Sequence, residues 1–146
     1  MFHHSFEHLP NPIEALEAVY RLLPPNGECM IRIPLVSSEA WKKYGTHWVQ
    51  LDAPRHFFLY SVESLKVLAE KTKFQIREIV HDSNESQFWG SEQYLKGILL
   101  LAENSYARNP AKSIFSKAEI KNYKQMARKL NLESQGDQAV IYMVKE

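Results

Sequence analysis

The N-terminal segment places three titratable side chains, His4, Glu7 and His8, in the pattern His-x-x-Glu-His. On a continuous helix this pattern sets two zinc-binding imidazoles one turn apart, with a glutamate base between them. Here Pro10 and Pro12 follow too closely for a helix to continue, and little chain precedes the motif. We therefore expect no metal at this motif and interpret its histidines as part of a strand-to-helix loop.

A second group of polar side chains lies within residues 35–60, a segment without a sustained hydrophobic period. Asp52, Arg55 and His56 are its candidate functional residues. Its aromatic residues are Trp41, Tyr44, Trp48, Phe57, Phe58 and Tyr60. A structureless segment of this length is usually functional, so we predict a long aromatic loop. Two interpretations stay open for its polar groups: a pocket with a few convergent polar side chains, or a hydrogen-bonded lock for the loop.

Helical spacing and turn signals predict the elements that position these residues. We expect helices at 11–22, from Ser61 onward, at 91–103 and from Ser116 onward, and strands at 28–33, 74–80 and 138–144. Asn11 with Glu14, and Ser116 with Glu119, fit the capping-box pattern at two helix starts. The alternation of helices and strands predicts an α/β layered sheet.

Composition excludes several classes of protein. The chain has 146 residues with 45% hydrophobic content, which fits one domain with a real core. The 18 Lys and Arg residues nearly balance the 17 Asp and Glu residues, so the chain has no net electrostatic field that would attract nucleic acid or an anionic membrane. The single Cys29 indicates core packing in a reducing compartment. The sequence shows neither a spanning apolar run nor a signal peptide, so we expect a cytoplasmic protein.

Two stretches resemble class I S-adenosylmethionine-dependent methyltransferases. Residues 3–34, HHSFEHLPNPIEALEAVYRLLPPNGECMIRIP, resemble the segment that follows the fourth strand of that family. There a loop with a Glu-His pair and a Pro leads to a helix, a Leu-x-Pro-x-Gly turn and the fifth strand. Residues 48–61, WVQLDAPRHFFLYS, resemble the W-x-x-L-D-x-P-R-H segment of a subgroup. Lys73 stands where the family usually has the Gly of a Gly-Phe pair, which puts that helix cap in doubt.

The resemblance implies a fold and a domain organisation. We expect the C-terminal part of a Rossmann-like α/β methyltransferase sheet, with the final strand antiparallel between the strands at 28–33 and 74–80. Residues 1–146 would form a single partial methyltransferase domain, in which roughly 85–136 are a helical insertion. The family's Gly-rich cofactor loop and its ribose-binding acidic residue have no counterpart here. We therefore expect a piece of a longer enzyme that is inactive alone and binds S-adenosylmethionine weakly or not at all.

The resemblance also assigns roles to individual residues. The expected catalytic residues are His8 and His56, those facing the cofactor are His3 and His4, those facing the substrate are Trp41, Trp48, Asp52 and Arg55, and no metal ligand is expected. The methyl acceptor would be a small molecule that the sequence does not identify. The alternative is a non-catalytic binding or regulatory module, a pseudoenzyme. In either case an exposed sheet edge favours pairing with another chain, including a second copy.

Overall fold

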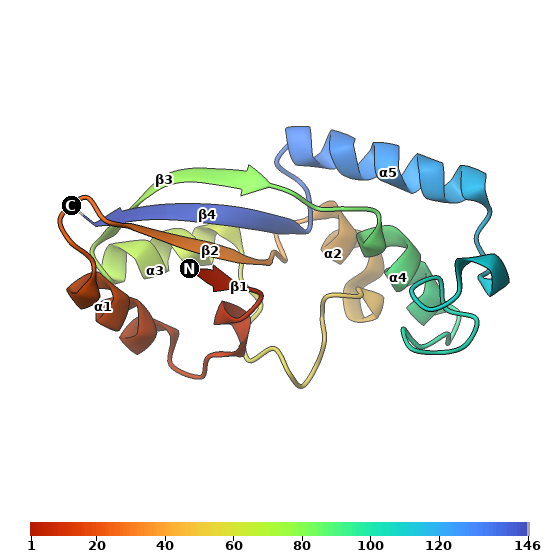
Figure 1. Cartoon of the computed structure of the whole chain (residues 1–146), viewed down its shortest axis with the longest axis horizontal. Coiled ribbons are helices and arrows are strands. Elements are labelled where there is room, and N and C mark those ends of the chain that lie inside the picture. The colour runs from red at the N-terminus through yellow and green to blue at the C-terminus, as the bar shows by residue number, and fades with distance from the viewer. Residues whose placement is uncertain (146) are drawn as a thin grey trace.

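The computed structural model describes residues 1–145 of the chain (Figure 1). In order, the elements are β1 (Phe2–His3), η1 (Phe6–His8), α1 (Pro12–Leu22), β2 (Glu28–Pro34), α2 (Glu39–Tyr44), η2 (Gly45–His47), α3 (Val62–Lys71), β3 (Phe74–His81), α4 (Ser86–Leu95), η3 (Pro110–Lys112), α5 (Lys117–Leu132) and β4 (Gln138–Lys145). No helix within residues 1–145 combines the length and the apolar character that crossing a bilayer requires.

The four strands form one mixed sheet in the order β1-β2-β4-β3. β4 is antiparallel to both of its neighbours, with Ile141 opposite Ile31 on one side and opposite Ile79 on the other. β1 pairs in parallel with β2 through only two residues. The predicted α/β fold, with the last strand between the other two long strands, is confirmed. One edge of the sheet is formed by β1 and the other by β3, so Ile31 and Arg32 of β2 pair with β1 and are not at an open edge.

One face of the sheet is covered by α1 and α3, which lie on the same side of it (Figure 1). Leu16 of α1 and Leu65 of α3 pack against Ile31 and Ile141, and each of these side chains is almost fully buried. Strand alternation sends Val140, Tyr142 and Val144 to the opposite face, where they stay partly exposed. The burial of one face by two amphipathic helices therefore supplies the main core.

A second hydrophobic cluster joins α2, α4 and α5 at the far end of the sheet (Figure 1). Trp48 is its largest buried side chain, and the indole Nε1 donates a hydrogen bond to the Asp137 carboxylate at 2.9 Å. Gln50 donates a second bond to the same carboxylate, at 3.2 Å. This pair of bonds fixes the segment after β2 to the start of β4.

The prediction of one structureless loop over residues 35–60 is wrong. Residues 39–44 form α2, because the Ser38 side chain accepts a hydrogen bond from the Trp41 backbone N–H and caps the helix. Gly45 then takes a positive φ of 51° and ends it. The helix is only six residues long, which is too short for a hydrophobic period to stand out in the sequence.

The helix expected at 91–103 is also displaced, since α4 begins at Ser86 and ends at Leu95. Gly97 adopts a left-handed φ of 70° and stops the helix. Leu99 is 71% exposed, so the apolar stripe that motivated the prediction is not a buried face. The buried face uses Phe88 together with polar side chains such as Gln87, which apolar periodicity does not detect.

The helix caps agree with the sequence in two of three cases. Ser116 and Glu119 form a capping box at the start of α5, and Ser61 forms one with Ser64 at the start of α3. The cap expected from Asn11 is not formed, because its side chain makes no capping hydrogen bond. Pro12 at the first helical position already fixes a helical φ, so the helix start does not depend on this cap.

We expect Lys73→Gly to raise the free energy of unfolding by about 0.5–1 kcal/mol. Lys73 has a φ of 63°, a left-handed conformation that glycine adopts without steric cost. Lys66 lies inside α3, so Lys66→Gly as a matched control should lower stability by about 1 kcal/mol. Urea unfolding of both variants tests this, and a destabilised Lys73→Gly protein would contradict it.

Candidate functional site

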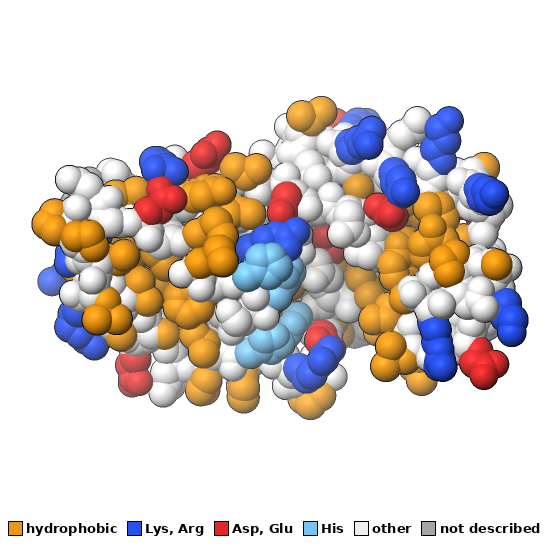
Figure 2. All heavy atoms as spheres, viewed as in Figure 1, with side chains coloured by type: hydrophobic (Ala, Val, Ile, Leu, Met, Phe, Trp, Pro, Cys, Tyr) orange, Lys and Arg blue, Asp and Glu red, His pale blue; other side chains and the backbone are white. Residues whose placement is uncertain are grey.

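The candidate site lies at the carboxyl ends of β1 and β2, two neighbouring parallel strands. Residues 4–8 follow β1 and residues 35–60 follow β2, so topology brings both polar segments to the same edge of the sheet. The Glu7 carbonyl accepts hydrogen bonds from the backbone N–H groups of Phe57 (2.9 Å) and Phe58 (3.4 Å). These bonds hold His56 beside Glu7. Histidine side chains gather near the middle of the face shown in Figure 2.

Glu7 is the most deeply buried charged side chain of this cluster, at 1% exposure. Its carboxylate lies 3.5 Å from Nδ1 of His4 and 4.0 Å from Nε2 of His56, and neither of its oxygens has a hydrogen-bond partner. Burial acts to raise the pKa of Glu7, but the adjacent His4, the local backbone and His56 outweigh it and leave the pKa below its ordinary value. Glu7 is therefore a buried, ionised and incompletely satisfied group.

His56 and His8 flank this carboxylate, with ring centroids 4.9 Å apart. Burial lowers the pKa of His56 despite the nearby Glu7 and Asp52 carboxylates, so the imidazole is neutral at neutral pH. Nδ1 of His8 lies 2.8 Å from the Arg55 carbonyl and donates to it, which leaves Nε2 with a free lone pair. The cluster thus combines a carboxylate with two imidazoles that can accept a proton or bind a cation.

His3 and His4 lie on the other side of Glu7, where they engage Arg32 of β2. Nη1 of Arg32 donates to Nε2 of His3 at 2.9 Å and of His4 at 3.2 Å, while its Nε pairs with Asp82 at 2.6 Å. A continuous polar chain therefore runs from Asp82 through Arg32 and His4 to Glu7. This chain orients the His4 ring toward the buried carboxylate.

The residues that the sequence assigned to the substrate lie in different surroundings in the structure. Asp52 and Arg55 form an ion pair of 2.6 Å, and the Arg55 side chain is 74% exposed. Trp48 is buried at 1% exposure and Trp41 packs edge-to-face on it, with centroids 5.7 Å apart. Of the residues predicted in this segment, only His56 faces Glu7. The contacts of Trp48 and Arg55 correspond to the alternative interpretation, in which hydrogen bonds and an ion pair hold the loop in place.

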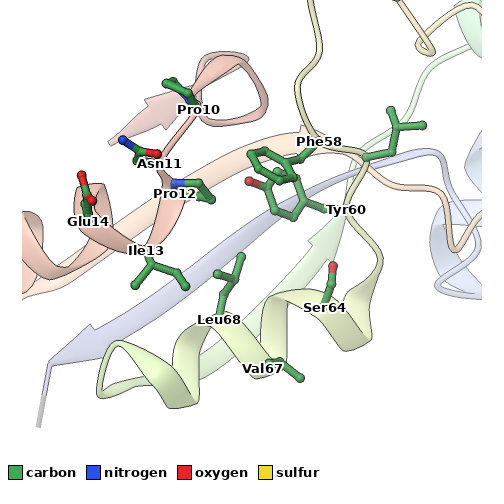
Figure 3. A pocket seen from close by; sticks show the side chains of 11 residues that line it. Pro10, Asn11, Pro12, Ile13, Glu14, Phe58, Tyr60, Ser64, Val67 and Leu68 are labelled. Carbon is green, nitrogen blue, oxygen red and sulfur yellow. The ribbon is translucent and has the colours of Figure 1, made fainter.

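An apolar groove of about 740 Å³ adjoins the polar cluster, between the start of α1, residues 58–60 and α3 (Figure 3). Pro12, Phe58 and Leu68 line it. The hydroxyl of Tyr60 at this wall is buried without a hydrogen-bond partner, and burial raises the pKa of this phenol. The sequence gives no sign that α1 and α3 contribute to this groove, because their outward positions look like ordinary surface.

The His-x-x-Glu-His motif does not lie on an α-helix. Residues 6–8 form one turn of 3-10 helix, and His4 precedes it with a φ of 47°. The geometric argument from Pro10 and Pro12 against the zincin arrangement of His4 and His8 is therefore confirmed.

The fold and the site together define a class of protein. A sheet whose last strand runs antiparallel between its neighbours, with a polar site at the carboxyl ends of the parallel strands, is the C-terminal architecture of a class I methyltransferase-like domain. A sequence model described as "Methyltransferase domain" matches residues 1–79, more than half of the chain. The chain belongs to the methyltransferase-domain family.

Solved structures agree with this assignment at the level of the fold. A SAM-dependent methyltransferase from Archaeoglobus fulgidus is 20% identical with a TM-score of 0.52, and the match covers 99% of this chain and 57% of that one. A Thermotoga maritima SAM-dependent methyltransferase, described as a possible histamine N-methyltransferase, is 15% identical with a TM-score of 0.51, covering 94% and 50%. The chain therefore spans about half the length of these relatives. No curated protein sequence matches it.

Proposed function

We propose that this chain is the acceptor-side, C-terminal part of an S-adenosylmethionine-dependent methyltransferase that acts on a small molecule in the cytoplasm. The single observation that carries the proposal is the buried Glu7, flanked by His8 and His56, at the carboxyl ends of two parallel strands. The adjoining apolar groove fits the apolar part of a small acceptor. A glycine-rich loop that holds the cofactor belongs, on this proposal, to residues outside the chain.

The carboxylate and imidazoles of this cluster are the kinds of group that methyl transfer requires on the acceptor side of the site. When bound, S-adenosylmethionine supplies an electrophilic methyl carbon on a sulfonium. The acceptor's lone pair forms the new bond to this carbon, and the electron pair of the carbon–sulfur bond stays on sulfur. The acceptor's proton passes to the neutral imidazole of His56, and the Glu7 carboxylate stabilises the imidazolium that results. His8 shares this role from the open side of the cluster.

The other candidate residues have supporting places in this proposal. His3 and His4 form the wall that faces the cofactor, with their ring nitrogens engaged by Arg32. The ion pair of Asp52 and Arg55 stabilises the turn that carries His56. Trp41 and Trp48 pack edge-to-face in the segment that precedes this turn. The partly exposed second sheet face and the edge at β1 are the surfaces that would pair with the rest of the enzyme or with a second copy.

We expect the 146-residue chain alone to bind S-adenosylmethionine weakly or not at all. His3, His4, Arg32 and Asp82 satisfy one another by hydrogen bonds, so they suit a wall beside the cofactor rather than a binding loop. Isothermal calorimetry measures this directly. Micromolar binding by the chain alone would contradict the proposed division of the site.

The activity itself is tested with a protein that joins this chain to a cofactor-binding half. Such a protein should transfer labelled methyl from S-adenosylmethionine to a member of a panel of small acceptors, and the chain alone should not. If the joined protein binds the cofactor but methylates no small molecule in the panel, the proposal of an acceptor-side enzyme domain is wrong.

A further inference from the structure

Three side chains in the candidate site converge as a set of metal ligands. Glu7, His8 and His56 each offer one ligand atom, and these atoms all lie within 4.8 Å of one another. Two of the residues come from η1 and the third from the turn at 52–56, so the set exists only in the folded chain. The set differs from the sequence motif, because His56 takes the place that His4 would occupy in a helical His-x-x-Glu-His site.

The carboxylate of this set lacks what a buried charge ordinarily has. Glu7 is 1% exposed, and neither carboxylate oxygen accepts a hydrogen bond. Leaving a buried charged group without hydrogen bonds costs several kcal/mol, so such groups are normally paired or coordinate a metal. Nδ1 of His4 lies 3.5 Å from Oε1 of Glu7, too far to satisfy the carboxylate. A metal ion at this position would bind the carboxylate oxygens of Glu7 that accept no hydrogen bond.

Both imidazoles are oriented for coordination. The Arg55 carbonyl fixes Nδ1 of His8 as a donor, which is the outer hydrogen bond that orients metal-binding histidines and leaves the second nitrogen free. Nε2 of His56 lies 4.0 Å from the Glu7 carboxylate and 3.8 Å from the Asp52 carboxylate.

The donor chemistry selects the kind of ion. Two imidazoles and one carboxylate suit Zn²⁺ and related divalent transition ions, whereas Mg²⁺ and Ca²⁺ prefer an all-oxygen shell. Tetrahedral bonds of about 2.1 Å put ligand atoms about 3.4 Å apart. The 4.0 Å between Glu7 and His56 needs a contraction of about 0.6 Å, and the widest separation in the set, within 4.8 Å, needs up to about 1.4 Å, which side-chain rotations supply.

We propose that Glu7, His8 and His56 bind one divalent transition-metal ion of the Zn²⁺ type and leave its fourth coordination position open. Three protein ligands with an open position form the arrangement of a catalytic rather than a structural zinc site. The open position would take the acceptor's oxygen or nitrogen; this part rests on the proposed function, but metal binding itself does not. With the ion bound, His56 acts on the acceptor through the metal instead of as a free base.

The test uses the 146-residue chain, purified without metal, and two probes, Zn²⁺ and Co²⁺. Calorimetry with Zn²⁺ should give one ion per chain, and Co²⁺ should produce visible absorption bands of a four-coordinate site. His8→Asn and His56→Gln should each weaken Zn²⁺ affinity at least tenfold, since each removes one of three ligands. His47→Asn, at an exposed histidine elsewhere, is the matched control and should bind like the parent chain.

Each outcome separates the metal site from the methyltransferase proposal. His8 is partly exposed, so His8→Asn keeps the test valid even where His56→Gln lowers stability, and thermal unfolding checks both variants. Absence of saturable one-to-one binding overturns the metal site, and so does Zn²⁺ affinity that is unchanged in both His8→Asn and His56→Gln. Either result leaves the proposal of methyl transfer, with His56 as the base, unaffected. Metal binding in an enzyme that transfers no methyl group would instead overturn only the proposed function.

Discussion

Replacing His56 with alanine is expected to lower methyl transfer by about 10²- to 10⁴-fold in a protein that contains both halves of the site. The imidazole is 7% exposed, neutral, and faces the Glu7 carboxylate, so it is the main proton acceptor of the cluster, and His8 on the open side accounts for the residual rate. The loss should appear in kcat, because the step that fails is the activation of the bound acceptor. Rates are measured per folded enzyme, after circular dichroism confirms the melting temperature.

Two controls sharpen this experiment. Arg55→Ala removes a side chain that is 74% exposed and paired with Asp52, and it should change the rate by only a few fold. Added imidazole should restore part of the activity of His56→Ala if the lost group is a base. If His56→Ala is less stable but its folded fraction is fully active, the segment at 52–56 is a structural feature only.

Asp137→Ala is expected to lower the free energy of unfolding by about 2–4 kcal/mol, because it breaks a pair of hydrogen bonds in the core. The buried carboxylate of Asp137 accepts from Trp48 Nε1 at 2.9 Å and from Gln50 Nε2 at 3.2 Å. Burial raises the pKa of Asp137, and the hydrogen bonds from Trp48 and Gln50 act against that rise. Removing the acceptor leaves the indole N–H buried without a partner, which is costlier than the bond is favourable.

Asparagine at the same position separates the hydrogen bond from the charge. Its side-chain oxygen still accepts from Trp48, so Asp137→Asn should lose much less stability than Asp137→Ala. Glu133→Ala, at an exposed position on α5's C-terminal side, is the surface control and should stay within about 0.5 kcal/mol of the parent chain. Urea unfolding followed by tryptophan fluorescence measures all three. Equal losses for alanine and asparagine would show that the charge, not the acceptor, is what matters.

Local sequence determined much of the fold. The capping box of Ser116 and Glu119 begins α5 where it was predicted, because both partners lie within one turn of the chain. The long strands were predicted from apolar runs bounded by turn residues, and each is present within two residues of its expected limits. Their order in the sheet followed from the family resemblance. Predictions failed where the signal was weak, as in the six-residue α2, or where polar side chains were buried, as in α4.

The candidate site depended on the tertiary structure. The sequence by itself singled out Glu7, His8 and His56 as residues able to do chemistry, and it placed them in two separate segments. Their meeting depends on the parallel pairing of β1 with β2 and on the bonds from the Phe57 and Phe58 backbone to Glu7. Likewise, the sequence gives Trp48 only as a candidate for the substrate side, and the hydrogen bond from its N–H to Asp137, 89 residues away, appears only in the folded chain. Such contacts are decided by sheet register and core packing, because residues distant in the chain carry no local pattern that records which of them will touch.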